Sequence, residues 1–260
     1  MRITSLAHVT AFFFEIGKRS RKWKLFLGLS LLPVLMAFVV KVLQAFSLGR
    51  SVPGLYIFNS IIMAFYLQFL ILILSLFIGT SVCSEELENK TLTYLTTRPV
   101  AKPEIIIGKY VAYLMFAILM TVVGVVLSFL VLNITDLTDA SLYQILIRDM
   151  TVLSLGLAAY TAFFTFIGTF LKKSILFGLV FSFGWENVIQ YFPGSTQKFA
   201  IAHYLKSLLP SEPTGRFSFL LFRLEPTSKG TAVVMLVFLT AVFLTLACLI
   251  FTGKEYILEE

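Results

Sequence analysis

Long stretches without charged residues limit this chain more than any other feature of its sequence. A helix needs about 20 apolar residues to cross a lipid bilayer. Five stretches approach or exceed that length: residues 25–40 (continued past Lys41 to Phe46), 55–85, 110–135, 151–171 and 231–253. A sixth stretch, residues 174–185, is shorter and runs into Glu186. The pattern predicts six membrane-spanning helices.

The composition agrees with a lipid environment. Hydrophobic residues make up 58% of the 260 residues and charged residues only 13%, about half the share in soluble domains. A soluble globular enzyme and a disordered chain are both excluded. We therefore predict an all-α, polytopic membrane protein with one transmembrane domain, residues 1–260. Cys83 and Cys248 lie in apolar runs, and His8 and His203 are far apart, so no metal site is predicted.

The distribution of Lys and Arg predicts the orientation, because cytoplasmic loops of membrane proteins carry an excess of these residues. With the N-terminus inside, 13 of the 21 Lys and Arg residues fall in cytoplasmic segments and three in the short outer loops. The other five lie in the long segment between the last two spans. Both termini are therefore expected in the cytoplasm. The same rule accounts for the net charge of +7, so no nucleic-acid partner is expected.

Two segments outside the spans are amphipathic. Residues 1–24 are expected to form an interfacial helix followed by a basic cluster, because apolar and polar side chains occupy opposite arcs of a helical wheel. The apolar arc holds Leu6, Val9, Phe12, Phe13 and Ile16, and the polar arc holds His8, Glu15, Lys18 and Arg19. Residues 186–230 include a predicted helix from Ser195 to Leu209, and we expect this segment to be re-entrant or interfacial on the outer leaflet.

Residues 84–109, between spans two and three, form the largest polar segment on the cytoplasmic side. Glu85, Glu86 and Glu88 begin it, and Thr91, Leu92 and Leu95 continue at helical spacing. Pro99 must end this helix, because proline disfavours helical backbone before it. A second helix is predicted from Pro103, since proline suits the first helical turn. The segment is therefore expected to be a short helix, a turn and a return to the membrane.

The predicted spans contain only a few polar or aromatic side chains that are candidates for a functional site. Glu186 is expected to reach water beside Trp185, either hydrogen-bonding a neighbouring helix or serving as an outer gate, substrate or proton site. Phe58, Phe65 and Phe69 share one predicted helical stripe, which could line a path for a hydrophobic substrate or pack against another helix. Apart from Lys41 and Glu186, the predicted spans hold no charged residue, which argues against ion-coupled transport.

The motifs of several enzyme classes are missing. The chain has no G-x-x-x-x-G-K-[ST] motif for nucleotide phosphates, no H-E-x-x-H and no G-x-S-x-G. The pair Glu85-Glu86 invites comparison with Glu-Glu membrane proteases. However, Lys90 stands where their pattern has Arg, and the chain has no histidine partner for the pair. We therefore expect no catalytic residue and no cofactor on this chain. An intramembrane protease is an alternative, as is a membrane scaffold for a cytoplasmic complex.

The segment SEELENKTLTYLTTRPVAKPEIIIGK, residues 84–109, resembles the type-2 permeases of ATP-binding-cassette (ABC) transporters. The resemblance rests on Glu86 and Glu88, Lys90-Thr91, Leu92 and Leu95, Arg98-Pro99-Val100 and Gly108-Lys109. Lys90 departs from the family, which often has Gly there. The six-span layout, the N-terminal interfacial helix, Trp185-Glu186 and His203-Tyr204-Leu205 also resemble this group.

The resemblance implies a transport subunit in the cytoplasmic membrane of a prokaryote. Such permeases pair with a second permease copy and with two cytoplasmic ATPase subunits, which hold the ATP and Mg²⁺. The segment after span two would be the coupling helix that contacts the ATPase. The implied coupling residues are Glu85, Glu86, Glu88, Thr91, Leu95, Arg98, Pro99 and Val100. The substrate would be hydrophobic or amphipathic, and the family implies export.

Overall fold

The structure, a computed structural model, describes residues 3–19, 21–46, 53–88, 102–134, 139–171, 173–189, 195–209 and 227–253. The elements in these ranges are all helices. Five of the described helical stretches are long and apolar enough to cross a membrane: Trp23–Phe46, Gly54–Cys83, Lys102–Leu132, Ala140–Phe170 and Lys229–Gly253. The prediction of an all-α, polytopic membrane protein is confirmed.

The predicted fifth span is shorter than the others. It forms the apolar helix Ser174–Val188, which consists of α10 (Ser174–Val180), the π-helix η3 (Phe181–Trp185) and α11 (Glu186–Val188). A helix of this length rises about 22 Å, which is less than the roughly 30 Å of a bilayer core. In the described part of the chain, the six predicted spans therefore correspond to five long helices and one short apolar helix.

The second span is one continuous helix interrupted by two π-helical turns. In chain order it consists of α4 (Gly54–Ile57), η1 (Phe58–Ile62), α5 (Met63–Phe65), η2 (Tyr66–Leu70) and α6 (Ile71–Glu88). A π-turn closes each hydrogen bond one residue later than an α-turn. Each such turn therefore rotates the residues that follow it relative to the face expected from an α-helical period.

Two spans begin well before the apolar stretches that predicted them, although the helical start of α8 near Pro103 was itself predicted. The third span, α8, is Lys102–Leu132, and the fourth, α9, is Ala140–Phe170, whereas the apolar stretches began at residues 110 and 151. Both helices continue through charged residues at one end. The hydropathy pattern stops at the first charge, but backbone hydrogen bonding does not. The extra turns bring Glu104 and Lys109 into α8 and Asp149 into α9.

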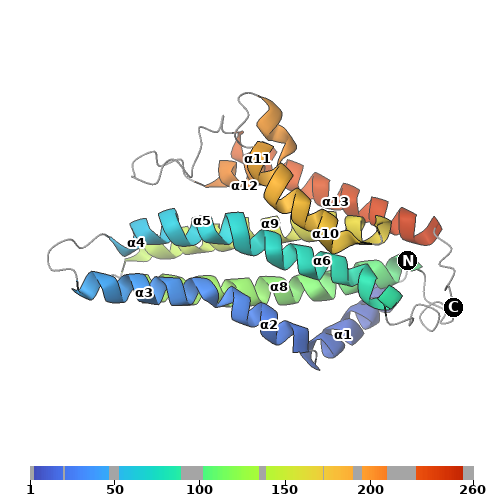
Figure 1. Cartoon of the computed structure of the whole chain (residues 1–260), viewed down its shortest axis with the longest axis horizontal. Coiled ribbons are helices and arrows are strands. Elements are labelled where there is room, and N and C mark those ends of the chain that lie inside the picture. Colours follow the sequence, from blue (N-terminus) through green and yellow to red (C-terminus); the bar gives the residue numbers. More distant parts are fainter. Residues whose placement is uncertain are drawn as a thin grey trace.

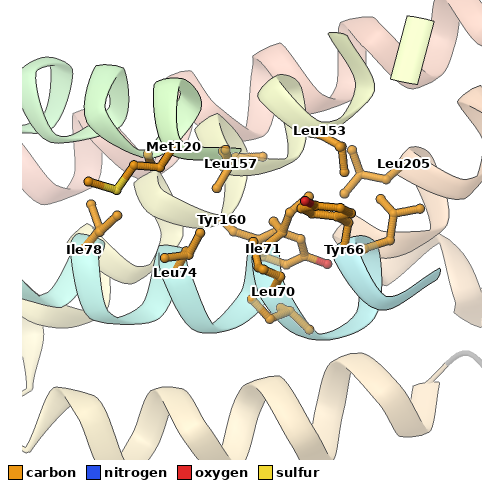
Figure 2. Packing of buried hydrophobic residues seen from close by; sticks show 14 of the residues in the cluster. Tyr66, Leu70, Ile71, Leu74, Ile78, Met120, Leu153, Leu157, Tyr160 and Leu205 are labelled. Carbon is orange, nitrogen blue, oxygen red and sulfur yellow. The ribbon is translucent and has the colours of Figure 1, made fainter. Parts of the chain in front are cut away.

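The fourth span, α9, lies at the centre of the bundle. It packs against α6, α8 and α13 (Lys229–Gly253), and against α12 (Ile201–Leu208), which follows the 3-10 helix η5 (Ser195–Phe199). Figure 2 shows Leu74 and Ile78 of α6 meeting Leu157 of α9 and Met120 of α8. Between α9 and α6, the Thr161 hydroxyl donates a hydrogen bond of 3.2 Å to Ser75 Oγ. Hydrogen bonds of this kind hold helices together where lipid offers no hydrophobic driving force.

The described helices define two ends of the molecule (Figure 1). The end of α6, the start of α8 and the end of α13 lie together at one end, beside α1 (Ile3–Arg19). At the opposite end, α3 (Leu32–Phe46), which continues from α2 (Arg21–Ser30), meets the last turn of α8. There the Lys41 ammonium donates a hydrogen bond of 3.1 Å to the Leu132 carbonyl oxygen. A cation at this position suits the negative end of the α8 dipole.

The predicted N-terminal helix is present as α1 and packs along α8. Part of its apolar arc faces the protein core and part faces outward. Phe13 is buried in the core and Val9 packs against it, whereas Phe12 and Ile16 are exposed. His8 and Glu15 are also exposed, on the polar side that the sequence predicted. Only part of the apolar arc therefore remains available to lipid.

Candidate functional site

The predicted coupling segment is partly within the described ranges. Glu85, Glu86 and Glu88 lie in the last turns of α6, which continues as a helix through Glu88. Thr91, Leu95, Arg98, Pro99 and Val100 fall outside the described residues. The chain is described again from Lys102, where α8 begins, so Pro103 occupies the first helical turn as the sequence predicted. The roles of these residues toward an ATPase remain a prediction.

The first turns of α8 are held tightly by α1. A methyl group on Gly108 would lie 2.6 Å from a methyl carbon of Val9, so the two helices are in direct contact. At the next residue of α8, the Lys109 side chain is 1% exposed. Its ammonium lies 5.5 Å from the Phe13 ring centroid and 5.4 Å from that of Tyr113. Cation–π contacts of this kind are strengthened by burial, so α1 and the start of α8 form one packed unit.

Glu186 does not reach water, contrary to the expectation from its position beside Trp185. Its side chain is 0% exposed, whereas Trp185 is exposed. Adjacent residues on a helix point about 100° apart, so an outward-facing tryptophan directs the next side chain toward the bundle. The hydrogen bond to a neighbouring helix, which the sequence suggested as one alternative, is present.

Three donors converge on one oxygen of the Glu186 carboxylate. The Tyr160 hydroxyl of α9 donates to Glu186 Oε1 at 2.5 Å. The backbone N–H groups of Ile201 and Ala202 donate to the same oxygen at 3.0 and 3.2 Å. These two N–H groups open α12 and have no acceptor within their own helix. Glu186 is therefore the N-terminal cap of α12, supplied by a different helix.

Helix α12 is deeply seated between α9, η2 and α13. Gly156 of α9 leaves room for Leu205, since a methyl group on Gly156 would lie 2.9 Å from the Leu205 Cδ1 atom. Figure 2 shows Leu205 beside Leu153 of α9. Helix α12 is bonded to Thr227, just before α13: His203 Nε2 in its first turn lies 2.8 Å from Thr227 Oγ1, and Ser207 Oγ in its last turn accepts the Thr227 N–H. Burial lowers the pKa of Lys206 on this helix to about 8, and the Glu186 carboxylate opposes that shift.

The predicted stripe of Phe58, Phe65 and Phe69 does not form one face. Phe58 is fully buried and packs edge-on against Phe129 of α8, with ring centroids 5.2 Å apart. Phe65 and Phe69 form a pair at 5.1 Å and are only half-buried, and Phe69 lies 6.4 Å from Phe183 of η3. The π-turns of the second span change the rotation between Phe58 and the pair. The place of these residues on a substrate path remains a prediction.

Asp149 is a buried charged residue that the sequence reasoning missed. Both Nε and Nη2 of Arg148 donate to Asp149 Oδ1, at 2.9 and 2.8 Å. The other oxygen, Oδ2, has no hydrogen-bond partner in the described part of the chain. The expectation that Lys41 and Glu186 are the only charges in the spans is therefore wrong. The adjacent Arg and Asp, just before an apolar stretch, were the available signal, because such a pair can enter a bundle together.

The described ranges contain no group of three or more His, Cys, Asp or Glu side chains that could hold a metal ion. Some buried polar side chains bond to each other across helix contacts, as Tyr160 and Glu186 do, and Thr161 and Ser75.

The described helices define an all-α polytopic membrane protein. A family model described as "ABC-2 family transporter protein" matches residues 13–185, about two-thirds of the chain. The chain belongs to this family of ABC transporter permeases, and the resemblance seen in residues 84–109 is confirmed at the level of the family. No curated protein matches the chain. The matched region ends at Trp185, so Glu186, α12 and α13 lie beyond it.

Proposed function

We propose that the chain is the permease subunit of an exporter driven by ATP hydrolysis on separate ATPase chains. The observation that carries this proposal is that the second span continues without a break through α6 to Glu88. The second span runs as one helical rod from Gly54 through Glu88, and α8 returns directly from Lys102 into the third span. A force applied to residues 84–109 would therefore tilt both spans as rigid bodies.

The proposed assembly contains two permease copies and two ATPase subunits, and ATP and Mg²⁺ bind on the ATPases. The absence of a phosphate-binding motif from the sequence supports this division of roles. The distribution of Lys and Arg supports a cytoplasmic location for both termini and for residues 84–109. The end of α6, the start of α8 and the end of α13 lie at one end of the molecule, which agrees with this orientation (Figure 1).

The coupling contact in this proposal is electrostatic. Glu85, Glu86 and Glu88 would form charge-assisted hydrogen bonds with basic residues of the ATPase. Arg98-Pro99-Val100 would shape the turn that leads back to α8. The packing of α1 on Gly108 and Lys109 supports a stiff connection, because it braces the helix that receives the movement.

The proposed substrate is hydrophobic or amphipathic, as suggested by the half-buried face of the second span. Phe65 and Phe69 lie on this face together with Gln68, which is also half-buried. Lipid tails satisfy an aromatic ring but not an amide. A face that carries both suits a path for a molecule with apolar and polar parts. Glu186 lies one turn beyond Phe183, so we place the outer gate there.

The coupling role can be tested without a known substrate. The permease is purified from native membranes with its co-purifying ATPase, and ATP hydrolysis is measured in lipid nanodiscs. We expect the double variant Glu88→Ala/Arg98→Ala to bind the ATPase but to lose the effect of the permease on its rate. The control is Asp139→Asn/Lys229→Gln, which also removes two charges, both from exposed positions near the opposite end. Equal rates for the two double variants, or the reproducible absence of an ATPase, would contradict the proposal.

A further inference from the structure

Tyr160 and Glu186 connect the centre of the bundle to α12. We propose that this pair is an outer latch, which holds α12 in the bundle and opens during each transport cycle. In this mechanism Tyr160 is a positioning residue that acts through the Glu186 carboxylate. The inference rests on the proposed export function. The contact itself stands on geometry, because three donors meet a single oxygen of a fully buried carboxylate.

The latch has two stable arrangements for a physical reason. When α12 is seated, the carboxylate and the first N–H groups of α12 satisfy each other. If α12 shifted by a few ångströms and stayed buried, the carboxylate and two backbone N–H groups would all lose partners in an apolar setting. A buried unsatisfied polar group is costly, and a buried charge more so. Helix α12 is therefore stable either fully seated or released to water, where solvent replaces these hydrogen bonds.

The position of α12 explains why its release would matter for transport. Leu205 and Ile71, the first residue of α6, both lie against Gly156 of α9. The helix also contacts η2, which carries Phe69 of the proposed substrate face. When α12 is seated, it thus fixes the position of the second span relative to the fourth span at this end. Its release would free them to separate beside that face.

Helix α12 is attached to two parts of the fold, and this sets the direction of movement. Its first N–H groups depend on the carboxylate of Glu186. His203 in its first turn and Ser207 in its last turn are both bonded to Thr227, just before α13. Opening the latch would therefore detach α12 from Glu186 and Tyr160 while its bonds to Thr227 remain, so that α12 moves together with the start of α13.

The latch can be tested by the accessibility of a single cysteine. Ala200, just before α12, is buried, so Ala200→Cys is shielded while the helix is seated. It is placed in a Cys83→Ala/Cys248→Ala background and labelled with a membrane-impermeant maleimide in right-side-out membrane vesicles that contain the whole complex. The test variants are Tyr160→Phe and Glu186→Gln. The matched control is Tyr110→Phe, which also removes a tyrosine hydroxyl bonded to α9, here to the Ala158 carbonyl at 3.0 Å.

We expect labelling of Tyr160→Phe to be about tenfold faster than that of the parent, because a hydrogen bond to a charged group shifts an equilibrium by at least this factor. Glu186→Gln should show at least the same increase, and Tyr110→Phe should label at the parental rate. In the parent, ATP turnover should accelerate labelling relative to the nucleotide-free complex. Equal rates in Tyr160→Phe and Tyr110→Phe would overturn the latch. Faster labelling in the variants, with no response of the parent to turnover, would overturn its opening during transport.

Failure of the proposed export function would show separately, as the absence of an ATPase from the purified complex. The comparison of Tyr160→Phe with Tyr110→Phe needs no ATP and no partner. It therefore still decides whether the Tyr160–Glu186 contact holds α12 in place.

Discussion

Gly79 of α6 lies against the backbone of Thr161 in α9, with no space left for a side chain. A Cβ atom on Gly79 would be 2.7 Å from the Thr161 carbonyl oxygen and 2.7 Å from the Cβ atom of Phe164. Neither atom can move aside without displacing α9. The close approach of the second and fourth spans therefore depends on this glycine, as small residues allow in membrane helix packing generally.

We expect Gly79→Ala to destabilise the protein by about 2 kcal/mol, because the added methyl group overpacks a rigid helix contact. The apparent melting temperature in detergent, read by fluorescence-detected size exclusion, measures the effect. The control is Gly28→Ala in α2, where an added Cβ meets nothing within 4 Å. That variant should be unchanged or slightly more stable, since Ala favours helix over Gly. Equal melting temperatures for the two variants would contradict the packing argument.

The Arg148–Asp149 pair predicts a strongly non-additive double-mutant cycle. Arg148→Ala leaves the fully buried Asp149 carboxylate without its partner and should destabilise the protein by about 3 kcal/mol. Asp149→Asn should cost less, because the Arg148 side chain is 32% exposed and has access to the surface. The double variant Arg148→Ala/Asp149→Asn should recover most of the stability lost in Arg148→Ala. Additive losses in the apparent melting temperature would show that the two side chains do not interact.

Phe58 and Phe69 should behave differently despite their shared helix. Phe58 is fully buried against Phe129, so Phe58→Ala should lower the stability by about 3–5 kcal/mol. Phe69→Ala removes a half-buried ring from the proposed substrate face. It should cost less stability but change substrate-stimulated ATP hydrolysis of the complex. Thermal denaturation and ATPase assays of both variants make the test, and a stable Phe58→Ala protein would contradict the burial of this ring.

The environment of Lys206 predicts a pH dependence of stability. Burial lowers its pKa from the usual 10.5 to about 8, against the opposing effect of Glu186. Between pH 8 and 10.5 the unfolded chain therefore binds more protons at this residue than the folded chain does. It follows that this group makes the free energy of unfolding rise with pH in that window, and contributes no slope well below pH 8. In Lys206→Met, melting temperatures measured at pH 8 and pH 10 should show a smaller gain, or a larger loss, than in the parent. Identical changes in the two proteins would contradict the shifted pKa.

Sequence reasoning located the helices well where the signal is local. Lipid burial of a span depends on about 20 consecutive residues, so the apolar stretches predicted the spans directly. The start of α8 near Pro103 followed from the local chemistry of proline, and α1 from its own period. The family resemblance in residues 84–109 was also a property of adjacent residues.

The same reasoning failed where the direction of a side chain, or the limit of a helix, depends on other residues. A single α-helical period placed Phe58 with Phe69, but the π-turns η1 and η2 changed the rotation between them. The hydropathy pattern placed the start of the fourth span at residue 151, because it treats a charged residue as a boundary. The helix nevertheless begins earlier and includes Asp149, because Arg148 offsets the charge of this residue.

The sequence by itself determined that this protein is a helical membrane protein of the ABC-2 transporter family, because lipid solvation and family motifs are written in consecutive residues. Only the tertiary structure decided what Glu186 does. Its position at the end of an apolar stretch suggested water, whereas the fold buries it against Tyr160 and the first turn of α12. The partners that stabilise a buried charge are 26 and 15 residues away along the chain, and only helix packing brings them together.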